Sequence, residues 1–220
     1  AAIAVLAGLS MSYDMNLPEA ARLLKQAVSL SDQDETVLGA VGRLTMATGD
    51  GPRTIAVFEQ LGRRDPLNGG AWGGLGFAYI VFGKYVDAIA ALRKSLELEP
   101  DAVFTHEHLG EALLFSGDLD GALAEMQREP HDIMRRLGLA FVFAAQGKRE
   151  AAQQLLEEVG REHPDFASPV AAGYAQLGMH DESFEWLDRA LQERDGGVLE
   201  VRAGPLFQPL RRDPRYVPLL

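Results

Sequence analysis

The sequence predicts an all-α fold: a right-handed α-solenoid, or superhelix, of about six antiparallel helix pairs with a C-terminal capping segment. Two series of small residues predict it. One recurs in steps of 34 residues, at Gly8, Gly42, Gly76 and Gly110, and continues as Ala140 and Ala171. The other consists of glycines suited to ending a helix, at Gly49, Gly83, Gly117, Gly147 and Gly178. A fixed period of this length indicates stacked two-helix units.

Residues 69–102 carry the most complete unit, with landmarks at Trp72, Leu75, Gly76, Tyr79, Gly83, Ala88, Leu92 and Pro100. Gly76 and Ala88 would let the two helices approach closely, and Pro100 would end the unit. These landmarks resemble the tetratricopeptide repeat, with Leu92 in a position that the family pattern gives to Phe. The resemblance covers residues 1–197 and implies a solenoid that binds other proteins.

The repeats are expected at about 1–34, 35–68, 69–102, 103–132, 133–163 and 164–197. The first is thinly packed, because small residues such as Ala4 stand where the third has Trp72. Its second helix should run from about Pro18 to Leu30. In the fourth repeat Pro130 arrives one helical turn early, so its second helix should end near Arg128. We expect this lost turn to disturb the regular step to the fifth repeat.

Residues 198–220 are rich in proline, which allows only short helices, beginning at Pro205 and Pro214. This cap should cover the edge of the sixth repeat. Its expected apolar contacts are Leu206, Phe207, Leu210, Tyr216, Leu219 and Leu220. The residue pattern from Phe207 to Tyr216 resembles the C-terminal end of many bacterial multidomain tetratricopeptide signalling proteins. In those proteins an effector domain often precedes the repeats.

Composition excludes several functions. The net charge of −11 argues against a nucleic-acid partner. No apolar run approaches the roughly 20 residues that span a bilayer, so we expect no membrane insertion by this segment. Residues 1–9 are apolar but lack a basic start, and they are interpreted as a helix rather than a signal peptide. The absence of cysteine leaves the compartment undecided, with the cytoplasm favoured over the periplasm.

No catalytic motif and no cofactor signature is recognised. The glycines of residues 69–76 fit the repeat, and no strand precedes them as a phosphate-binding loop requires. His106, Glu107, His108 and Glu111 are the one cluster of ligand-like side chains. Metal binding would need three or four convergent ligands. The favoured interpretation is that His106 packs in the place of Trp72 and His108 is partly exposed, with no metal.

The resemblance implies a concave groove lined by side chains of the first helix of each repeat. In the family these side chains stand at fixed positions relative to the small residue of each first helix. The corresponding residues of this sequence are Val5, Leu9, Arg43, Met46, Phe77, Ile80, Phe104, Glu107, Glu111, Leu114, Leu137 and Phe141, followed by Ala144, Ser168, Ala172 and Ala175. The cochaperone branch clamps a peptide's terminal carboxylate with Lys and Asn in such positions. In this sequence the corresponding positions are occupied by Val5, Leu9, Gly39, Arg43, Gly73 and Phe77. The carboxylate clamp is therefore absent.

The sequence therefore predicts a non-catalytic scaffold for protein–protein interaction, with a mostly apolar groove and an acidic spot at Glu107 and Glu111. The expected partner is a peptide or protein, such as an amphipathic segment with basic residues, or another domain of the parent chain. In the second case the groove is covered by the protein itself. Two alternatives remain open: a sensory or autoregulatory region of a larger bacterial signalling protein, and an arm that presents substrate to a fused enzyme.

Overall fold

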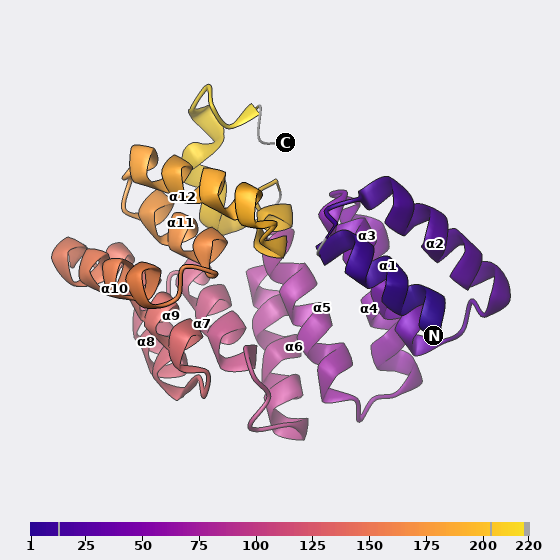
Figure 1. Ribbon diagram of the computed structural model, residues 1–220. Coiled ribbons are helices and arrows are strands. Elements are labelled where there is room, and N and C mark those ends of the chain that lie inside the picture. The colour runs from indigo at the N-terminus through magenta and orange to yellow at the C-terminus, as the bar shows by residue number, and fades with distance from the viewer. Residues whose placement is uncertain (13, 203, 218–220) are drawn as a thin grey trace.

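The computed structural model describes residues 1–12, 14–202 and 204–217, which form twelve α-helices, two 3-10 helices and no strand (Figure 1). The α-helices form six successive pairs, as predicted. Their bounds are α1 Ala2–Ser12, α2 Leu17–Leu30, α3 Glu35–Ala47, α4 Gly51–Arg64, α5 Gly69–Val81, α6 Tyr85–Leu98, α7 Thr105–Ser116, α8 Leu119–Arg128, α9 Asp132–Ala145, α10 Arg149–Glu162, α11 Ala167–Gln176 and α12 His180–Glu193. None of these helices is long and apolar enough to cross a membrane.

Local sequence explains most helix ends. At the starts of six α-helices the side chain of the preceding residue accepts a hydrogen bond from a backbone N–H of the first turn. These capping residues are Asn16, Asp34, Asp50, Asn68, Asp118 and His131. All five glycines predicted to end the first helices have positive φ, between 69° and 92°. Glycine adopts this conformation without the steric cost that a Cβ imposes. The helix boundaries therefore follow largely from local capping.

The packing between paired helices places a large side chain against the glycine of the first helix. Ala88 is fully buried, and the atoms closest to Gly76 belong to Leu92: a Cβ on Gly76 would lie 2.4 Å from Leu92 Cγ. The same relation holds for two other glycines. A Cβ on Gly42 would lie 2.8 Å from Phe58 Cε2, and one on Gly110 would lie 2.9 Å from Met126 Cε. Each glycine thus receives a large side chain from the second helix of its own pair.

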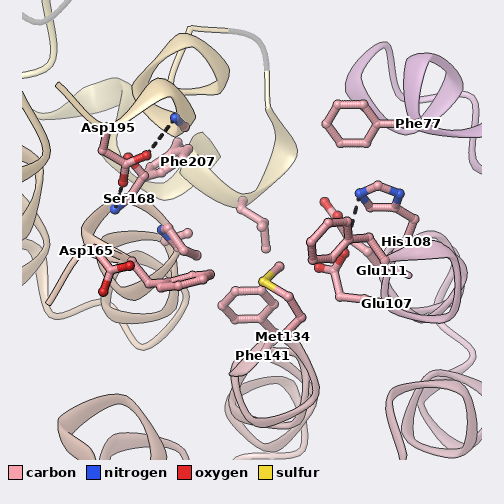
Figure 2. Close-up of a pocket in the computed structure, with 16 residues that line it drawn as sticks. Phe77, Glu107, His108, Glu111, Met134, Phe141, Asp165, Ser168, Asp195 and Phe207 are labelled. Carbon is pink, nitrogen blue, oxygen red and sulfur yellow. Dashed lines mark hydrogen bonds and ion pairs between the residues drawn. The ribbon is translucent and has the colours of Figure 1, made fainter. Parts of the chain in front are cut away.

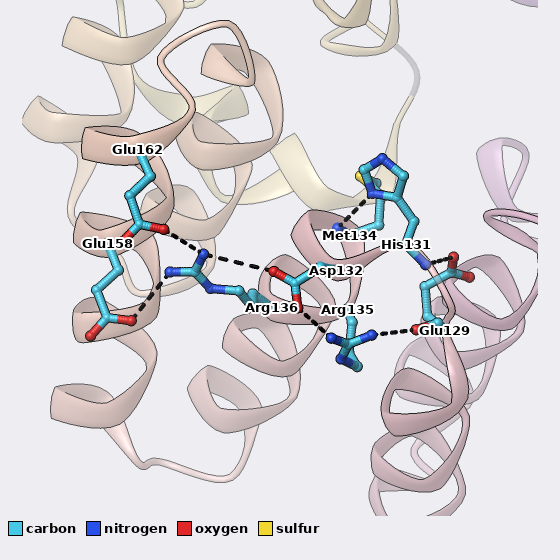
Figure 3. A network of polar contacts seen from close by, with 8 residues as sticks. All are labelled: Glu129, His131, Asp132, Met134, Arg135, Arg136, Glu158 and Glu162. Atoms are coloured by element: carbon cyan, nitrogen blue, oxygen red, sulfur yellow. Dashed lines mark hydrogen bonds and ion pairs between the residues drawn. The ribbon is translucent and has the colours of Figure 1, made fainter.

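The shortened helix of the fourth pair is confirmed, because α8 ends at Arg128. A single core cluster nevertheless continues past it, from Ile80 through Met126 to Tyr216. Arg135 of α9 supports this junction by donating to the Glu129 backbone oxygen at 2.9 Å (Figure 3). Arg136 connects α9 to α10, because its Nη1 donates to Glu162 Oε2 at 2.8 Å and its Nη2 donates to Glu158 Oε2 at 3.3 Å (Figure 3). Two separate clusters fill the first repeats.

The tail packs on the sixth helix pair, as expected, but its form was only partly predicted. The helix η2, Pro205–Arg212, begins at the predicted proline and lies against α11. Residues 214–216 form a turn instead of the second predicted helix. An unpredicted 3-10 helix, η1 Gly196–Glu200, precedes both. The expected contacts of Leu219 and Leu220 lie outside the described residues.

The tail also crosses toward the first repeat. A Cβ built on Gly196 would lie 3.3 Å from the backbone oxygen of Ser12, at the end of α1. Leu199 of η1 lines a hollow together with Met11 of α1 and Met46 of α3. The two ends of the array therefore approach one another, as the indigo and yellow ribbons in Figure 1 show.

Candidate ligand-binding groove

Three adjacent hollows lie along the row of first helices from α3 to α11, and together they form what we call the groove. Their volumes are about 200, 490 and 320 Å³ in order from α3 toward α11. Phe77 of α5 lines all three, and His108 of α7 lines the second and third. The two rings stack with centroids 4.6 Å apart, so they form the boundary between the second and third hollows.

The third hollow, which we call the α7–α11 pocket, combines aromatic rings with carboxylates (Figure 2). Its rings belong to Phe77, Phe104, Phe141, Phe166 and Phe207. Glu107, His108 and Glu111 form one wall, and Asp165, Ser168 and Asp195 lie on the opposite side. Its volume is at the lower end of the range for ligand pockets.

The carboxylates of Glu107 and Glu111 lie one helical turn apart on α7 and are each only 4% exposed. His108 Nε2 lies 3.5 Å from Glu107 Oε2. Burial lowers the pKa of His108 to about 4, so this imidazole is neutral at pH 7.

A buried carboxylate holds the start of α7 in place. The residue before the helix, Phe104, has a left-handed backbone with φ 69° and gives no side-chain cap. Glu129, only 1% exposed, accepts instead from the backbone N–H groups of Phe104 and Glu107, both at 3.2 Å. It also accepts from His131 N at 3.0 Å (Figure 3). The end of α8 thus fixes the position from which Glu107 faces the pocket.

Aromatic residues stand immediately before three consecutive first helices: Phe104 before α7, His131 before α9 and Phe166 before α11. Their ring centroids are 5.4 Å and 6.2 Å apart in sequence order. Phe104 and Phe166 line the α7–α11 pocket. The repeat pattern predicts Phe104 within a helix and does not predict Phe166, although both residues stand at the same position before a first helix.

The opposite wall is fixed by the start of the tail. Asp195 accepts from the backbone N–H groups of Ser168 and Gly197, at 2.8 Å and 2.9 Å. Ser168 is 2% exposed, and within the described residues its Oγ has no hydrogen-bond partner. Leu206 and Phe207 of η2 complete this side. The tail, expected only as an end cap, therefore also forms part of the pocket.

The structure brings most of the predicted groove residues together. Those that line the three hollows are Arg43, Met46, Phe77, Phe104, Glu107, Glu111 and Phe141, together with Ser168 and Ala172. Three predicted groove residues are wrong: Ile80, Leu114 and Leu137 are buried in the core, where neighbouring helices cover them. Val5 and Leu9 are exposed on α1, and Leu9 lines a separate shallow hollow beside α2.

His106 has the packing role that the sequence favoured. It is 4% exposed, and its Nδ1 lies 2.7 Å from Glu125 Oε2 of α8. It thus joins the two helices of its pair, while His108 faces the groove. No group of three metal-ligating side chains occurs in the part of the chain that the structure describes.

Six stacked helix pairs with a groove along their first helices define a helical-repeat protein of the solenoid class. The family is shown by sequence profiles, each described as a tetratricopeptide repeat. They match residues 42–103, 78–133 and 113–177. The matches together span more than half of the chain, which therefore belongs to the tetratricopeptide repeat family. Such repeats generally mediate protein–protein interaction.

Solved structures agree on the fold. A tetratricopeptide repeat protein of Thermus thermophilus, TTC0263, is 18% identical, with a TM-score of 0.71 over 80% of this chain and 97% of that one. A tetratricopeptide repeat protein from Parabacteroides merdae ATCC 43184 is also 18% identical, with a TM-score of 0.69 over 99% of this chain and 81% of that one. At this identity the likeness concerns the fold alone.

One curated relative is much longer than this chain. It is cellulose synthase 1 operon protein C of Komagataeibacter xylinus, which is 28% identical over 187 residues. The match covers 77% of this chain but only 14% of that protein, so this chain corresponds to a small part of its length.

Proposed function

We propose that this chain is a non-catalytic scaffold that binds an amphipathic segment of another polypeptide in the groove. The observation that carries the proposal is the α7–α11 pocket. There Phe77, Phe104 and Phe141, from separate parts of the sequence, meet the carboxylates of Glu107 and Glu111. An apolar hollow with a few polar groups at its wall suits a bulky anchor side chain beside a Lys or Arg.

The two kinds of lining residue would contribute differently. The aromatic rings would supply most of the affinity, because buried aromatic contacts dominate such interfaces. The carboxylates would set orientation and raise the association rate, and their effect should weaken as salt rises. A partner that contacts several repeats would also lie along the groove, since Phe77 connects all three hollows.

A second candidate is supported by the tail. Because Leu206 and Phe207 already line the α7–α11 pocket, part of the groove is covered by the protein itself. This arrangement suits an autoregulatory region, in which the groove responds to a segment of its own parent chain. The same surface would then serve an intramolecular partner.

A peptide-array screen with purified protein tests the proposal. Phe77→Ala should weaken most bound peptides by about tenfold or more, since it removes a ring shared by three hollows. Glu111→Lys, with the milder Glu111→Gln beside it, should weaken only peptides with basic residues. Val86→Ala is the matched control, because Val86 is 79% exposed on α6 and lines none of the hollows. Unchanged binding in both groove variants would show that the groove is not the binding surface.

A further inference from the structure

The 3-10 helix η1 is held at both of its ends by the last helix pair and the tail. Before it, the Asp195 carboxylate accepts from the backbone N–H groups of Ser168 and Gly197, at 2.8 Å and 2.9 Å. After it, Val201 is 3% exposed, and its backbone oxygen accepts from the Tyr216 hydroxyl at 2.5 Å. The five residues of η1 therefore form a short bridge between two fixed points.

Between these points η1 reaches the opposite end of the array. A Cβ built on Gly196 would lie 3.3 Å from the Ser12 backbone oxygen and 3.7 Å from Ser12 Cβ, at the end of α1. Leu199, which is half-buried, forms one side of the first hollow. The other sides come from α1, α3 and α5, with Met11 and Ala47 among their lining residues. The bridge thus joins the sixth repeat to the first across the α3 end of the groove.

Two glycines let the chain take this path. A Cβ on Gly197 would lie only 2.8 Å from Ser168 Cβ, so a residue without a side chain is needed where the chain leaves α11. Gly196 leaves room for the Ser12 backbone oxygen on the side of α1. The contact with the first repeats is small, since η1 has five residues and Leu199 is only half-buried. A small contact between two firm attachments suits a segment that detaches without unfolding of the array.

We propose that η1 is a displaceable strap that closes the groove at its α3 end, with Leu199 bordering the first hollow. A ligand that extends from the α7–α11 pocket into the first hollow meets this strap, and an apolar anchor on the ligand competes with Leu199 for the surface of α1 and α3. The inference goes beyond the proposed function, because it concerns how the chain controls access to its groove. Its tests use no peptide, so their failure would leave the proposed function standing.

A disulfide tests the closed position, because the sequence contains no cysteine of its own. The 3.7 Å between Ser12 Cβ and the Cβ position of Gly196 lies within the usual disulfide range of about 3.5–4.5 Å. Ser12→Cys with Gly196→Cys should therefore form an intramolecular bond in glutathione buffer, and mass spectrometry measures its extent. Ser29→Cys with Gly196→Cys is the matched control, since Ser29 lies near the far end of α2. No bond in the first pair, or equal oxidation of both pairs, would overturn the strap.

Labelling of a single cysteine tests whether the strap restricts access. Ala47→Cys places a thiol in the first hollow, which Ala47 lines without lining the other two. A bulky maleimide should label this thiol about fivefold faster when Leu199→Asp is added, the change expected from the loss of a half-buried leucine contact. Leu199→Ala should act in the same direction but less strongly.

The control for labelling is Val86→Cys, at a residue of α6 that is 79% exposed. Its labelling rate should be the same with and without Leu199→Asp, and circular dichroism checks that each variant is folded. Equal labelling of Ala47→Cys with either residue at position 199 would show that η1 does not restrict the groove, and it would overturn the proposal.

Discussion

At Gly76 the missing side chain is a packing requirement, because Leu92 occupies the space that a Cβ would need. The repeat pattern located both small positions of this contact, Gly76 and Ala88. Ala88 is fully buried and lets α6 lie close to α5. Spacing alone identifies small positions; it cannot say which neighbouring side chain fills each one, since that depends on the helix crossing.

Replacement of Ala88 by Leu should therefore overpack the contact between α5 and α6 and cost about 1–3 kcal/mol of unfolding free energy. The matched control is Ala124→Leu, in the exposed part of α8, which should change stability by no more than about 0.5 kcal/mol. Urea unfolding followed by circular dichroism measures both. Equal losses in the two variants would contradict the assignment of Ala88 to the interface.

The candidate groove shows the same limit of sequence reasoning. In the second to sixth repeats the residue one position after each small residue lines a hollow; these residues are Arg43, Phe77, Glu111, Phe141 and Ala172. Four positions after the small residue, Met46 lines a hollow, whereas Ile80 and Leu114 are buried in the core. Whether a neighbour covers this second position depends on how successive pairs stack, which the sequence does not specify.

At the scale of elements, the tail departs most from what its sequence indicates. Gly196 and Gly197 favour a loop, yet they begin η1, because Asp195 accepts from Gly197 N and from Ser168 N of α11. The fold of this segment thus depends on a tertiary contact. Farther on, Arg215 contacts the Phe184 ring, 4.2 Å from its centroid, and holds Asp213 at 2.8 Å. Arg215 therefore fastens the tail to α12.

These contacts predict a pH dependence. Hydrogen bonds from Arg215 lower the pKa of Asp213 to about 2, compared with about 3.9 in an unfolded chain. The stabilisation is thus fully present above about pH 4 and is lost as the pH falls toward 2. Asp213→Asn should lower the urea midpoint at pH 6, and its difference from wild type should vanish near pH 2. Asp101→Asn, at an exposed turn residue, is the control. A difference that persists unchanged at pH 2 would contradict this role for Asp213.

At the scale of the whole molecule, most of the buried apolar residues that the structure describes fall into three clusters. The largest extends from Ile80 to Tyr216, and the cluster at the amino-terminal end contains only residues of α1, α2 and α3. The sequence predicted this thin end, since Ala4 and Ala7 fill it where Trp72 and Leu75 fill the third repeat. Leu6 and Leu9 on the outer side of α1 are about half exposed, at 53% and 46%. Repeat arrays are stabilised mainly by contacts between neighbours, so an end with fewer contacts is expected to open first.

The rate of amide hydrogen exchange should therefore depend on where a helix lies in the array rather than on the length of the helix. Amides of α1 and α2 should exchange fastest among the α-helices, because opening them breaks only the small amino-terminal cluster. Amides of α7 to α10 should exchange slowest, since they lie in the middle of the largest one. The pair α11 and α12 is the internal control: it is also terminal among the helix pairs, but η2 covers α11, so its protection should exceed that of α1 and α2. Equal protection at the two ends, measured by mass spectrometry, would show that neither the tail nor the cluster boundaries govern the opening of the array.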